Sequence, residues 1–394
     1  MKNIDLAILA GGKGTRIKNF TNNLPKPMVK INNLHFLQYL INIFSKYPIS
    51  TIYILTGFKN ESIFKKFHKK TFNFTNIVCL KEKKLMGTGG ALTKLKSKKK
   101  DFILINGDTI FDINLTNFVK SISKKKLGCL ALTSNNKNTN NYKLNNLNIK
   151  NNTLIYQKKS KLMNGGVYFF RKRIFNFIKN KPFSLENEFL PKFIRNKQIA
   201  GVNYKDFFLD IGTPKYLKLS PIKLKKYFYK PAAFLDRDGV INYDNGYVYK
   251  KNDFKFRKGV LKGLKYLIKK NYYIFLITNQ AGIAKGYYQE SDLKKLHIYL
   301  KNHLSKKNIY FDDVQYCPFH PNGKVKKYRK KTSLRKPGNQ MINNIYKNWT
   351  VNKKKSFMIG DKFSDELCAK KSKIYFSYAE KDFYKQVKKI CKNI

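Results

Sequence analysis

Two carboxylates, Asp236 and Asp238, follow directly after a short apolar run at 232–235 and precede Gly239. A short apolar run that ends in a turn residue is typical of a buried strand in a parallel sheet. Open α/β sheets bind their ligands beyond the carboxyl ends of the strands. Two such close carboxylates are hard to keep ionised without a cation, and their oxygens suit Mg²⁺. Alone, the pattern is more typical of an Asp-rich turn, but motifs further along the chain favour a metal and phosphate site.

Three later segments of the chain could complete this site. One apolar run leads into a hydroxyl and an amide, which can bind phosphate without competing for the metal. A basic turn then offers fixed positive charge, and a last apolar run delivers a third carboxylate. The side chains that these segments supply are Thr278, Asn279, Arg335, Lys336 and Asp361. Any one of them could be an ordinary strand end or turn of an α/β fold, whereas the order in which they occur together indicates phosphate chemistry.

The order of these motifs resembles the haloacid dehalogenase (HAD) phosphatases over residues 231–375. The strings at 236–242, 278–283 and 335–337 look most like D,D-heptose 1,7-bisphosphate phosphatases, and the histidinol phosphatases share much of them. The resemblance implies that Asp236 is the nucleophile and Asp238 the general acid and base. The implied ligands are Thr278 and Lys336 for the phosphoryl oxygens, Asn279 and Arg335 for the sugar phosphate, and Asp236, the backbone carbonyl of Asp238, and Asp361 for Mg²⁺.

One part of the phosphatase pattern is missing. Members of this family often hold zinc with a Cys-x-His and a Cys-x-Cys pair ahead of the Arg-Lys-Pro motif. The four corresponding positions here are Cys317, Phe319, Thr332 and Leu334, with His320 one place off. One or two ligands cannot make a closed tetrahedral site, so no structural zinc is expected. The Lys-rich loop at 322–331 must then be held by packing or stay mobile.

A second set of motifs occupies the first half of the chain. An apolar run at 6–10 leads into a glycine-rich turn at 11–16, whose backbone N–H groups could cradle phosphate. The turn lacks the ending of a P-loop, and a plain tight turn explains it equally well alone. More specific segments follow at 24–28, 85–91, 102–108, 164–170 and 208–214.

This ordered set resembles the sugar-1-phosphate nucleotidyltransferase family over about the first 215 residues. The stretch at 183–186 looks most like heptose- or mannose-1-phosphate guanylyltransferases. The resemblance implies that the glycine-rich turn holds the triphosphate, that 87–90 passes close to the base and ribose, and that Gly165 approaches the sugar. The implied residues are Arg16 and Lys26 for catalysis, Gly11, Gly12, Gly14, Thr15, Gly87, Gly89, Gly165 and Lys158 for substrate binding, and Asp108 and Asp210 for Mg²⁺. A solvated surface lysine is an equally good account of Lys158.

The motifs predict an α/β protein of two domains. We expect a Rossmann-like nucleotidyltransferase domain with a mixed sheet at 1–220 and a HAD-like domain with a parallel sheet at 231–394. A short, stiff linker is expected at 221–230, which is basic and aromatic and has no glycine or serine. Residues 135–152, rich in Asn, Lys and Thr, are expected to form weak strands on the sugar side.

Composition limits the remaining possibilities. The chain has 394 residues and a net charge of +59, which alone would suggest nucleic-acid binding. The charge is nearly all lysine, however, dispersed among residues that share A/T-rich codons, so no specific nucleic acid is expected. The five cysteines form no CxxC pair and indicate reduced thiols in the cytoplasm. No membrane segment is expected, and the oligomeric state is not predicted.

Joined, the two halves predict consecutive steps toward a nucleotide-activated heptose. The phosphatase would remove the phosphate at position 7 of heptose 1,7-bisphosphate, and the transferase would couple heptose 1-phosphate to a nucleotide, most simply GMP from GTP. One alternative is a mannose-1-phosphate guanylyltransferase fused to a phosphatase of another substrate, such as histidinol phosphate. Another is a basic binding protein with decayed enzyme domains, which the intact aspartates argue against.

Overall fold

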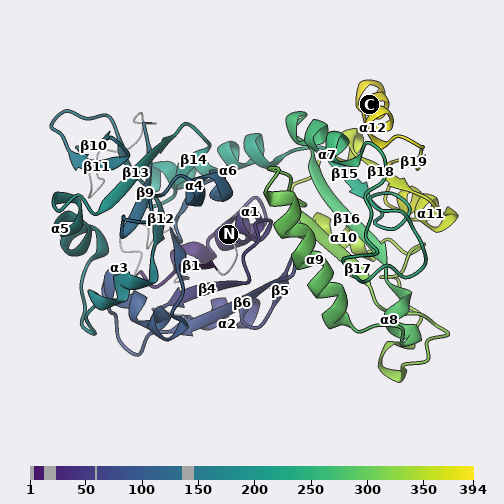
Figure 1. The fold of residues 1–394 in the computed structure, drawn as a ribbon, viewed down its shortest axis with the longest axis horizontal. Helices are drawn as coiled ribbons and strands as arrows, with labels where there is room; N and C mark the ends of the chain where they lie inside the picture. Colours follow the sequence, from purple (N-terminus) through teal and green to yellow (C-terminus); the bar gives the residue numbers. More distant parts are fainter. Residues whose placement is uncertain (1–3, 13–23, 58–59, 135–145) are drawn as a thin grey trace. The chain divides into compact units, whose positions relative to one another are not determined.

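The computed structural model describes residues 4–12, 24–57, 60–134 and 146–394. The chain forms two compact units, one made of 1–44 and 49–223 and the other of 45–48 and 224–394. Figure 1 colours the strands of the first unit purple to teal and those of the second green to yellow. Within the described part of the chain, no helix combines the length and apolar character needed to cross a membrane.

The first unit is built on a ten-stranded mixed sheet with the order β10-β11-β13-β9-β12-β7-β1-β4-β6-β5. β1 lies in a parallel group with β7, β4 and β6, whereas β12 runs antiparallel to both β7 and β9. The strands are β1 (Asp5–Leu9), β4 (Thr51–Thr56), β5 (Thr71–Phe72), β6 (Thr75–Lys81), β7 (Phe102–Asn106), β9 (Gly128–Thr133), β10 (Leu147–Lys150), β11 (Thr153–Tyr156), β12 (Met163–Phe170) and β13 (Ile199–Tyr204). The mixed sheet confirms the expected fold class.

Short helices and two small ribbons complete this unit. The ribbons pair β2 (Lys30–Ile31) with β3 (Leu34–His35), and β8 (Thr109–Phe111) with β14 (Phe208–Asp210). The helices are η2 (Lys26–Met28), α1 (Phe36–Ser45), α2 (Glu61–Phe67), α3 (Gly87–Gly90), η3 (Ala91–Lys98), α4 (Leu115–Lys120), η5 (Lys172–Asn176), η6 (Leu185–Phe189) and α5 (Leu190–Arg195). Of the segment expected to form weak strands, 135–145 lies outside the described residues, and the rest supplies β10, with β11 beginning directly after it.

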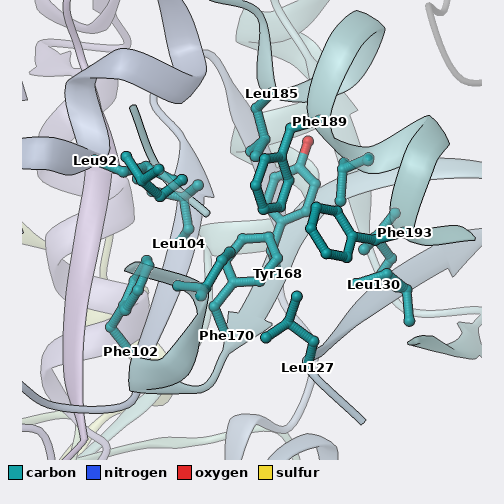
Figure 2. Close-up of a cluster of buried hydrophobic side chains, with 14 of the residues drawn as sticks. Leu92, Phe102, Leu104, Leu127, Leu130, Tyr168, Phe170, Leu185, Phe189 and Phe193 are labelled. Carbon is teal, nitrogen blue, oxygen red and sulfur yellow. The ribbon is translucent and has the colours of Figure 1, made fainter. Parts of the chain in front are cut away.

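A buried apolar cluster fixes η6 and α5 against the sheet. Figure 2 shows Leu185, Phe189 and Phe193 packed beside Tyr168 and Phe170 of β12. The rings of Phe189 and Phe193 stack with centroids 4.4 Å apart. Because aromatic side chains bury a large apolar area, this cluster anchors the segment that follows residue 183 to the strand that holds the 164–166 motif.

The second unit has a five-stranded, all-parallel sheet in the order β17-β16-β15-β18-β19. The strands are β15 (Ala232–Leu235), β16 (Tyr273–Asn279), β17 (Asp313–Cys317), β18 (Phe357–Gly360) and β19 (Tyr375–Tyr378). The helices are α7 (Val260–Lys269), α8 (Ala281–Lys285), α9 (Glu290–Ser305), η7 (Lys326–Tyr328), α10 (Gln340–Asn348), η8 (Lys353–Lys355), α11 (Phe363–Lys371) and α12 (Phe383–Asn393). β15, β16 and β18 are almost entirely buried, as their continuous apolar runs predict.

The expected linker at 221–230 is largely helical, because α6 runs from Pro214 to Phe228 and contains Pro221. A proline has no N–H to donate to the carbonyl four residues earlier, here that of Leu217. The hydroxyl of Ser220 donates to that same carbonyl at 2.7 Å. Burial of Leu224 and Phe228 then favours the continued helix, so the proline does not mark a boundary.

Candidate active sites

Two carboxylates of the first unit converge where β7 and β14 end. Asp108 follows β7 by two residues, and Asp210 closes β14 opposite Thr109. A Cβ added to Gly212 would lie 2.7 Å from Asp210 Oδ1 and 3.6 Å from Asp108 Oδ2, so both carboxylates border this glycine. Lys26 Nζ lies 3.3 Å from Asp108 Oδ2. This arrangement brings two oxygen donors and one cation together, as a metal-assisted phosphoryl transfer requires.

The glycine-rich turn is only partly described. Gly14, Thr15 and Arg16 lie outside the described residues, whereas Gly11 and Gly12 follow β1. Gly107 packs so close to the carbonyl of Leu9 that a Cβ would collide with it, and its N–H donates to that carbonyl at 3.0 Å. The end of β1 therefore lies directly beside the segment that leads to Asp108.

Three glycines expected to approach the substrate have packing reasons for lacking a side chain. Gly87 has a φ of +71°, and a Cβ there would lie 2.5 Å from the carbonyl oxygen of Phe183. A Cβ on Gly89 would collide with the ring of Phe183, and one on Gly165 with the ring of Phe111. Their roles toward the base and the sugar stay predictions, because neighbouring aromatic residues alone already require glycine.

Glu186 is a half-buried carboxylate to which the sequence assigned no role. It accepts hydrogen bonds from the hydroxyls of Thr88 at 2.6 Å and Tyr168 at 3.3 Å. Lys158, by contrast, is exposed just beyond β11. The signal for Glu186 was its place in the 183–186 motif, which served only to identify a subfamily.

In the second unit, three carboxylates meet at the carboxyl edge of the sheet. Asp236 follows β15, Asp361 follows β18, and Asp365 lies in the first turn of α11. One oxygen of each lies within 4.8 Å of the others, a spacing that can hold a metal ion. Asp361 Oδ1 is buried and has no partner among the described residues. The oxygen donor set fits Mg²⁺.

Lys336 links two of these carboxylates from inside the protein. Its Nζ lies 2.9 Å from Asp236 Oδ2 and 2.5 Å from Asp365 Oδ1, and it donates to the carbonyl of Ile277 at 2.9 Å. The exposed fraction is 1% for the Lys336 side chain and 0% for that of Asp365. Asp365 is therefore placed to orient the Lys336 side chain.

Burial and charge together set the pKa values of Asp236 and Lys336. Burial raises the pKa of Asp236 to about 7 against the opposing charge of Lys336, and the nearby carboxylates of Asp365 and Asp238 add to the rise. Burial alone would lower the pKa of Lys336, but Asp236 and Asp365 outweigh it and hold the pKa above its ordinary value. The lysine is therefore charged, and a cation beside Asp236 would favour the carboxylate form.

Asp238 is held by side chains that the sequence did not single out. Arg237, fully buried, donates to it through Nε at 3.1 Å and through Nη2 at 2.8 Å. Asn242 and Gln280 also donate to its carboxylate, at 2.9 and 3.0 Å. A residue between two aspartates looks like a spacer in the sequence, and only the fold reveals that Arg237 turns inward beneath Asp238.

The remaining expected ligands lie around Lys336. Thr278 is 1% exposed, and its hydroxyl accepts from Gln280. The side-chain amide of Asn279 exchanges two hydrogen bonds of 3.1 Å with the backbone of Lys336, so Asn279 also fixes the basic turn. Arg335 Nη1 is buried and has no hydrogen-bond partner among the described residues, so this nitrogen is available to bind an anion.

The loop at 318–331 is held by contacts between protein groups. Cys317 Sγ lies 3.7 Å from the carbonyl of Phe319. The hydroxyls of Tyr316 and Tyr328 both donate to Glu290, at 2.9 and 2.6 Å, and tie the loop to the start of α9. The expectation of no zinc stays a prediction, and Glu290 explains how the loop can be ordered by packing.

Comparison with known proteins places both halves. The Nucleotidyl transferase family matches residues 6–221, and the Polynucleotide kinase 3 phosphatase family matches 232–390. A D-glycero-beta-D-manno-heptose-1,7-bisphosphate 7-phosphatase from Rhodopseudomonas palustris is 42% identical over 141 residues, which cover 36% of this chain and 78% of that protein. A D-glycero-alpha-D-manno-heptose 1-phosphate guanylyltransferase from Campylobacter jejuni is 35% identical over 214 residues, which cover 53% of this chain and 94% of that protein.

Among solved structures, the crystal structure of HddC from Yersinia pseudotuberculosis is 28% identical and has a TM-score of 0.48. It covers 56% of this chain, and all of that chain is covered. With its first half the chain belongs to the Nucleotidyl transferase family, and its second half is a HAD-like phosphatase domain.

Proposed function

We propose that this chain is a bifunctional enzyme of nucleotide-activated heptose synthesis. Its second unit would remove the 7-phosphate of D-glycero-D-manno-heptose 1,7-bisphosphate, and its first unit would transfer GMP from GTP to the resulting heptose 1-phosphate. The observation that supports this best is the convergence of Asp236, Lys336, Asp365 and Asp361 at one sheet edge, in a chain whose two halves resemble enzymes of these two reactions.

In the phosphatase reaction, an oxygen of Asp236 would attack the phosphorus of the 7-phosphate while the bond to the sugar oxygen breaks. Asp238 would give its proton to that leaving oxygen and later take one from the water that hydrolyses the aspartyl phosphate. Lys336 and Thr278 would hold the phosphoryl oxygens, and the unpaired Nη1 of Arg335 would receive the distant phosphate. Inorganic phosphate and heptose 1-phosphate are the products.

In the transferase reaction, a phosphate oxygen of heptose 1-phosphate would attack the α-phosphorus of GTP and release pyrophosphate. This in-line displacement needs positioning and charge neutralisation more than a strong base. Lys26 stands beside Asp108 as a cation for the phosphates. Bound Mg²⁺ would neutralise phosphate charge at both sites, held by Asp108 and Asp210 in the first unit, and by Asp236, Asp361 and the carbonyl of Asp238 in the second.

Separate sites on separate units predict separable activities. Asp236→Asn should abolish phosphate release from heptose 1,7-bisphosphate, because the amide cannot form the aspartyl phosphate. The same variant should release pyrophosphate from GTP and heptose 1-phosphate at the wild-type rate. Asp108→Asn, the reciprocal variant, should show the opposite pattern. Loss of both activities in either folded variant would mean that the two sites are not independent.

The anomer gives a stricter test of consecutive steps. The phosphatase relative is named for the beta anomer and the guanylyltransferase relative for the alpha anomer. A phosphate at position 1 locks the anomeric centre, so both units must act on one and the same anomer. Each reaction should therefore be measured with both anomers. Opposite strict preferences in the two reactions would refute the proposal, as would turnover of only mannose 1-phosphate or histidinol phosphate.

We also propose a cytoplasmic location, because all five cysteines are free, as expected in a reducing compartment. Sugar phosphates and a nucleoside triphosphate are the proposed partners, with no specific nucleic acid among them.

A further inference from the structure

Glu186 occupies an unusual electrostatic position for this chain. The sequence has 82 lysines and arginines against 23 aspartates and glutamates, so most carboxylates have a cation available. Glu186 is half-buried and accepts from two neutral hydroxyls, those of Thr88 and Tyr168. Among the residues that the structure describes, no lysine, arginine or histidine nitrogen lies within 4 Å of it. A carboxylate has about four acceptor positions, and these two bonds use half of them.

Local helix structure does not explain this carboxylate. The helical segment that begins at Leu185 is capped by Ser184, whose hydroxyl accepts from the N–H of Asn187 at 3.1 Å. The N–H of Ser184 donates in turn to Glu188 Oε1 at 2.8 Å. Glu188 thus completes the cap, and Glu186 is free of that task.

The partners of Glu186 are themselves fixed. Tyr168 is fully buried, and its hydroxyl accepts from Asn164 Nδ2 at 2.7 Å. Asn164 Oδ1 accepts in turn from the N–H of Gly166 at 3.1 Å. Burial, and next to it the charge of Glu186, raise the pKa of Tyr168 well above its ordinary value, so the phenol remains a donor. The carboxylate is therefore held in one orientation by a network that reaches into the bulge at 164–167.

The sheet order separates this network from the end of β1 by one strand and places it beside the 164–166 motif, which is expected to approach the sugar. β12, which contains Tyr168, pairs with β7, and β7 separates it from β1 and the glycine-rich turn that follows β1. An anion such as Glu186 would repel a triphosphate, whereas sugar hydroxyls are neutral donors that a carboxylate binds strongly. Of the parts of the two substrates, the sugar ring is the one that suits this position best.

We propose that Glu186 accepts hydrogen bonds from hydroxyl groups of the sugar 1-phosphate and thereby selects the sugar. The inference rests on the proposed transferase function and adds a specificity-determining residue to it. Thr88 and Tyr168 act as positioning residues that orient the carboxylate. Guanine also has N–H donors that could meet a carboxylate, so the test must separate the sugar from the nucleotide.

The experiment measures KM and kcat of nucleotidyl transfer in the full chain for Glu186→Gln, with GTP and heptose 1-phosphate varied in turn. A hydrogen bond to a charged group contributes enough that its loss should raise the KM for the sugar phosphate about ten- to hundred-fold. The KM for GTP should stay within about twofold, because the nucleotide does not touch this carboxylate. Glu188→Gln removes the same charge two residues away and should leave both constants near wild type.

Three results would overturn the inference. A raised KM for GTP alone would assign Glu186 to the base, and equal loss for both substrates would indicate a structural role. Unchanged constants would show that the carboxylate meets no substrate. KM does not depend on the folded fraction of a preparation, so a poorly folding variant still gives an answer. Wild-type protein that uses another sugar 1-phosphate would refute the heptose assignment, and Glu186 would then be tested with that sugar.

Discussion

Removing Lys336 should destabilise the second unit, because two buried carboxylates depend on its charge. The side chains of Asp236 and Asp365 are 9% and 0% exposed, and Lys336 Nζ lies 2.9 and 2.5 Å from them. In Lys336→Met, the aliphatic stem is roughly preserved while the charge is lost. Two carboxylates are then left close together in a buried site with no cation from the protein.

The size of the effect follows from breaking a buried ion pair. Removing one partner of such a pair costs about 3–5 kcal/mol, since the charge that remains is buried without compensation. For a unit of this size, that loss should lower the melting temperature by about 6–20 °C. Lys362→Met is the matched control, because this substitution also removes one lysine charge beside carboxylates. Lys362 lies near Asp361 and Asp244, but its side chain is 60% exposed. An exposed pair of this kind contributes about 0–1 kcal/mol.

The sequence provides a specific probe for this measurement. Its single tryptophan, Trp349, is buried in the second unit against Tyr273 and Phe275. Urea unfolding followed by tryptophan fluorescence therefore reports on this unit, and the free energy of unfolding follows from the midpoint and slope. The experiment is done with a chelator present, so that a bound cation cannot replace the lost lysine.

A second substitution makes the reasoning refutable. If the cost in Lys336→Met arises from uncompensated carboxylates, adding Asp365→Asn should restore much of the stability while phosphatase activity stays absent. A loss in Lys336→Met no larger than in Lys362→Met would refute the compensation argument. A double variant that is less stable than either single one would show that packing, and not charge, decides the stability of this site.

Three shorter predictions concern the metal, the loop and the net charge. Burial raises the pKa of Asp236 to about 7, so protons compete with the cation for this carboxylate. The Mg²⁺ affinity measured by calorimetry should therefore fall as the pH decreases below about 7, and equal affinities at pH 6 and pH 8 would contradict this. Glu290→Ala removes the hydrogen-bond acceptor of Tyr316 and Tyr328. Trypsin should then cut the loop at 322–331 faster, and the free energy of unfolding should fall by about 1–3 kcal/mol. An unchanged cleavage rate would show that other contacts order the loop. Duplex DNA should bind without sequence preference and dissociate steeply as salt rises, while phosphatase turnover persists; tight, selective binding at physiological salt without turnover would overturn the enzyme assignment.

The placement of the phosphatase residues could be predicted from the sequence, because it depends on backbone pattern. Apolar runs identified β15, β16 and β18, and parallel pairing brings their carboxyl ends to one edge. The N–H of Asp236 donates to the carbonyl of Ile359, two residues before Asp361, so the strand register itself sets these carboxylates side by side. Residue type and position within a strand were sufficient here.

The direction of side chains between those positions could not be read in the same way. Arg237 turns inward to hold Asp238, and Glu290 joins two tyrosines that are 12 residues apart in the chain. Such contacts depend on tertiary packing, which leaves no periodic pattern in the sequence. The continuation of α6 through Pro221 into the expected linker could not be predicted for a related reason, since Ser220 and the burial of Leu224 compensate locally for what proline removes.

The two units treat their carboxylates differently, and the proposed chemistry accounts for the difference. Asp108 remains 28% exposed beside Lys26, whereas Asp236 is 9% exposed and its neighbour Asp365 is fully buried. In nucleotidyl transfer the bond forms between two substrates, so the aspartates need only hold charge and tolerate water. In the phosphatase, Asp236 itself would form the bond to phosphorus. Water with free access to the Asp236 carboxylate would compete with Lys336 as a hydrogen-bond donor, and the carboxylate would then be held less firmly in one orientation. A nucleophile therefore has to be shielded from water and fixed in place, and the buried lysine opposes the rise in pKa that this burial causes.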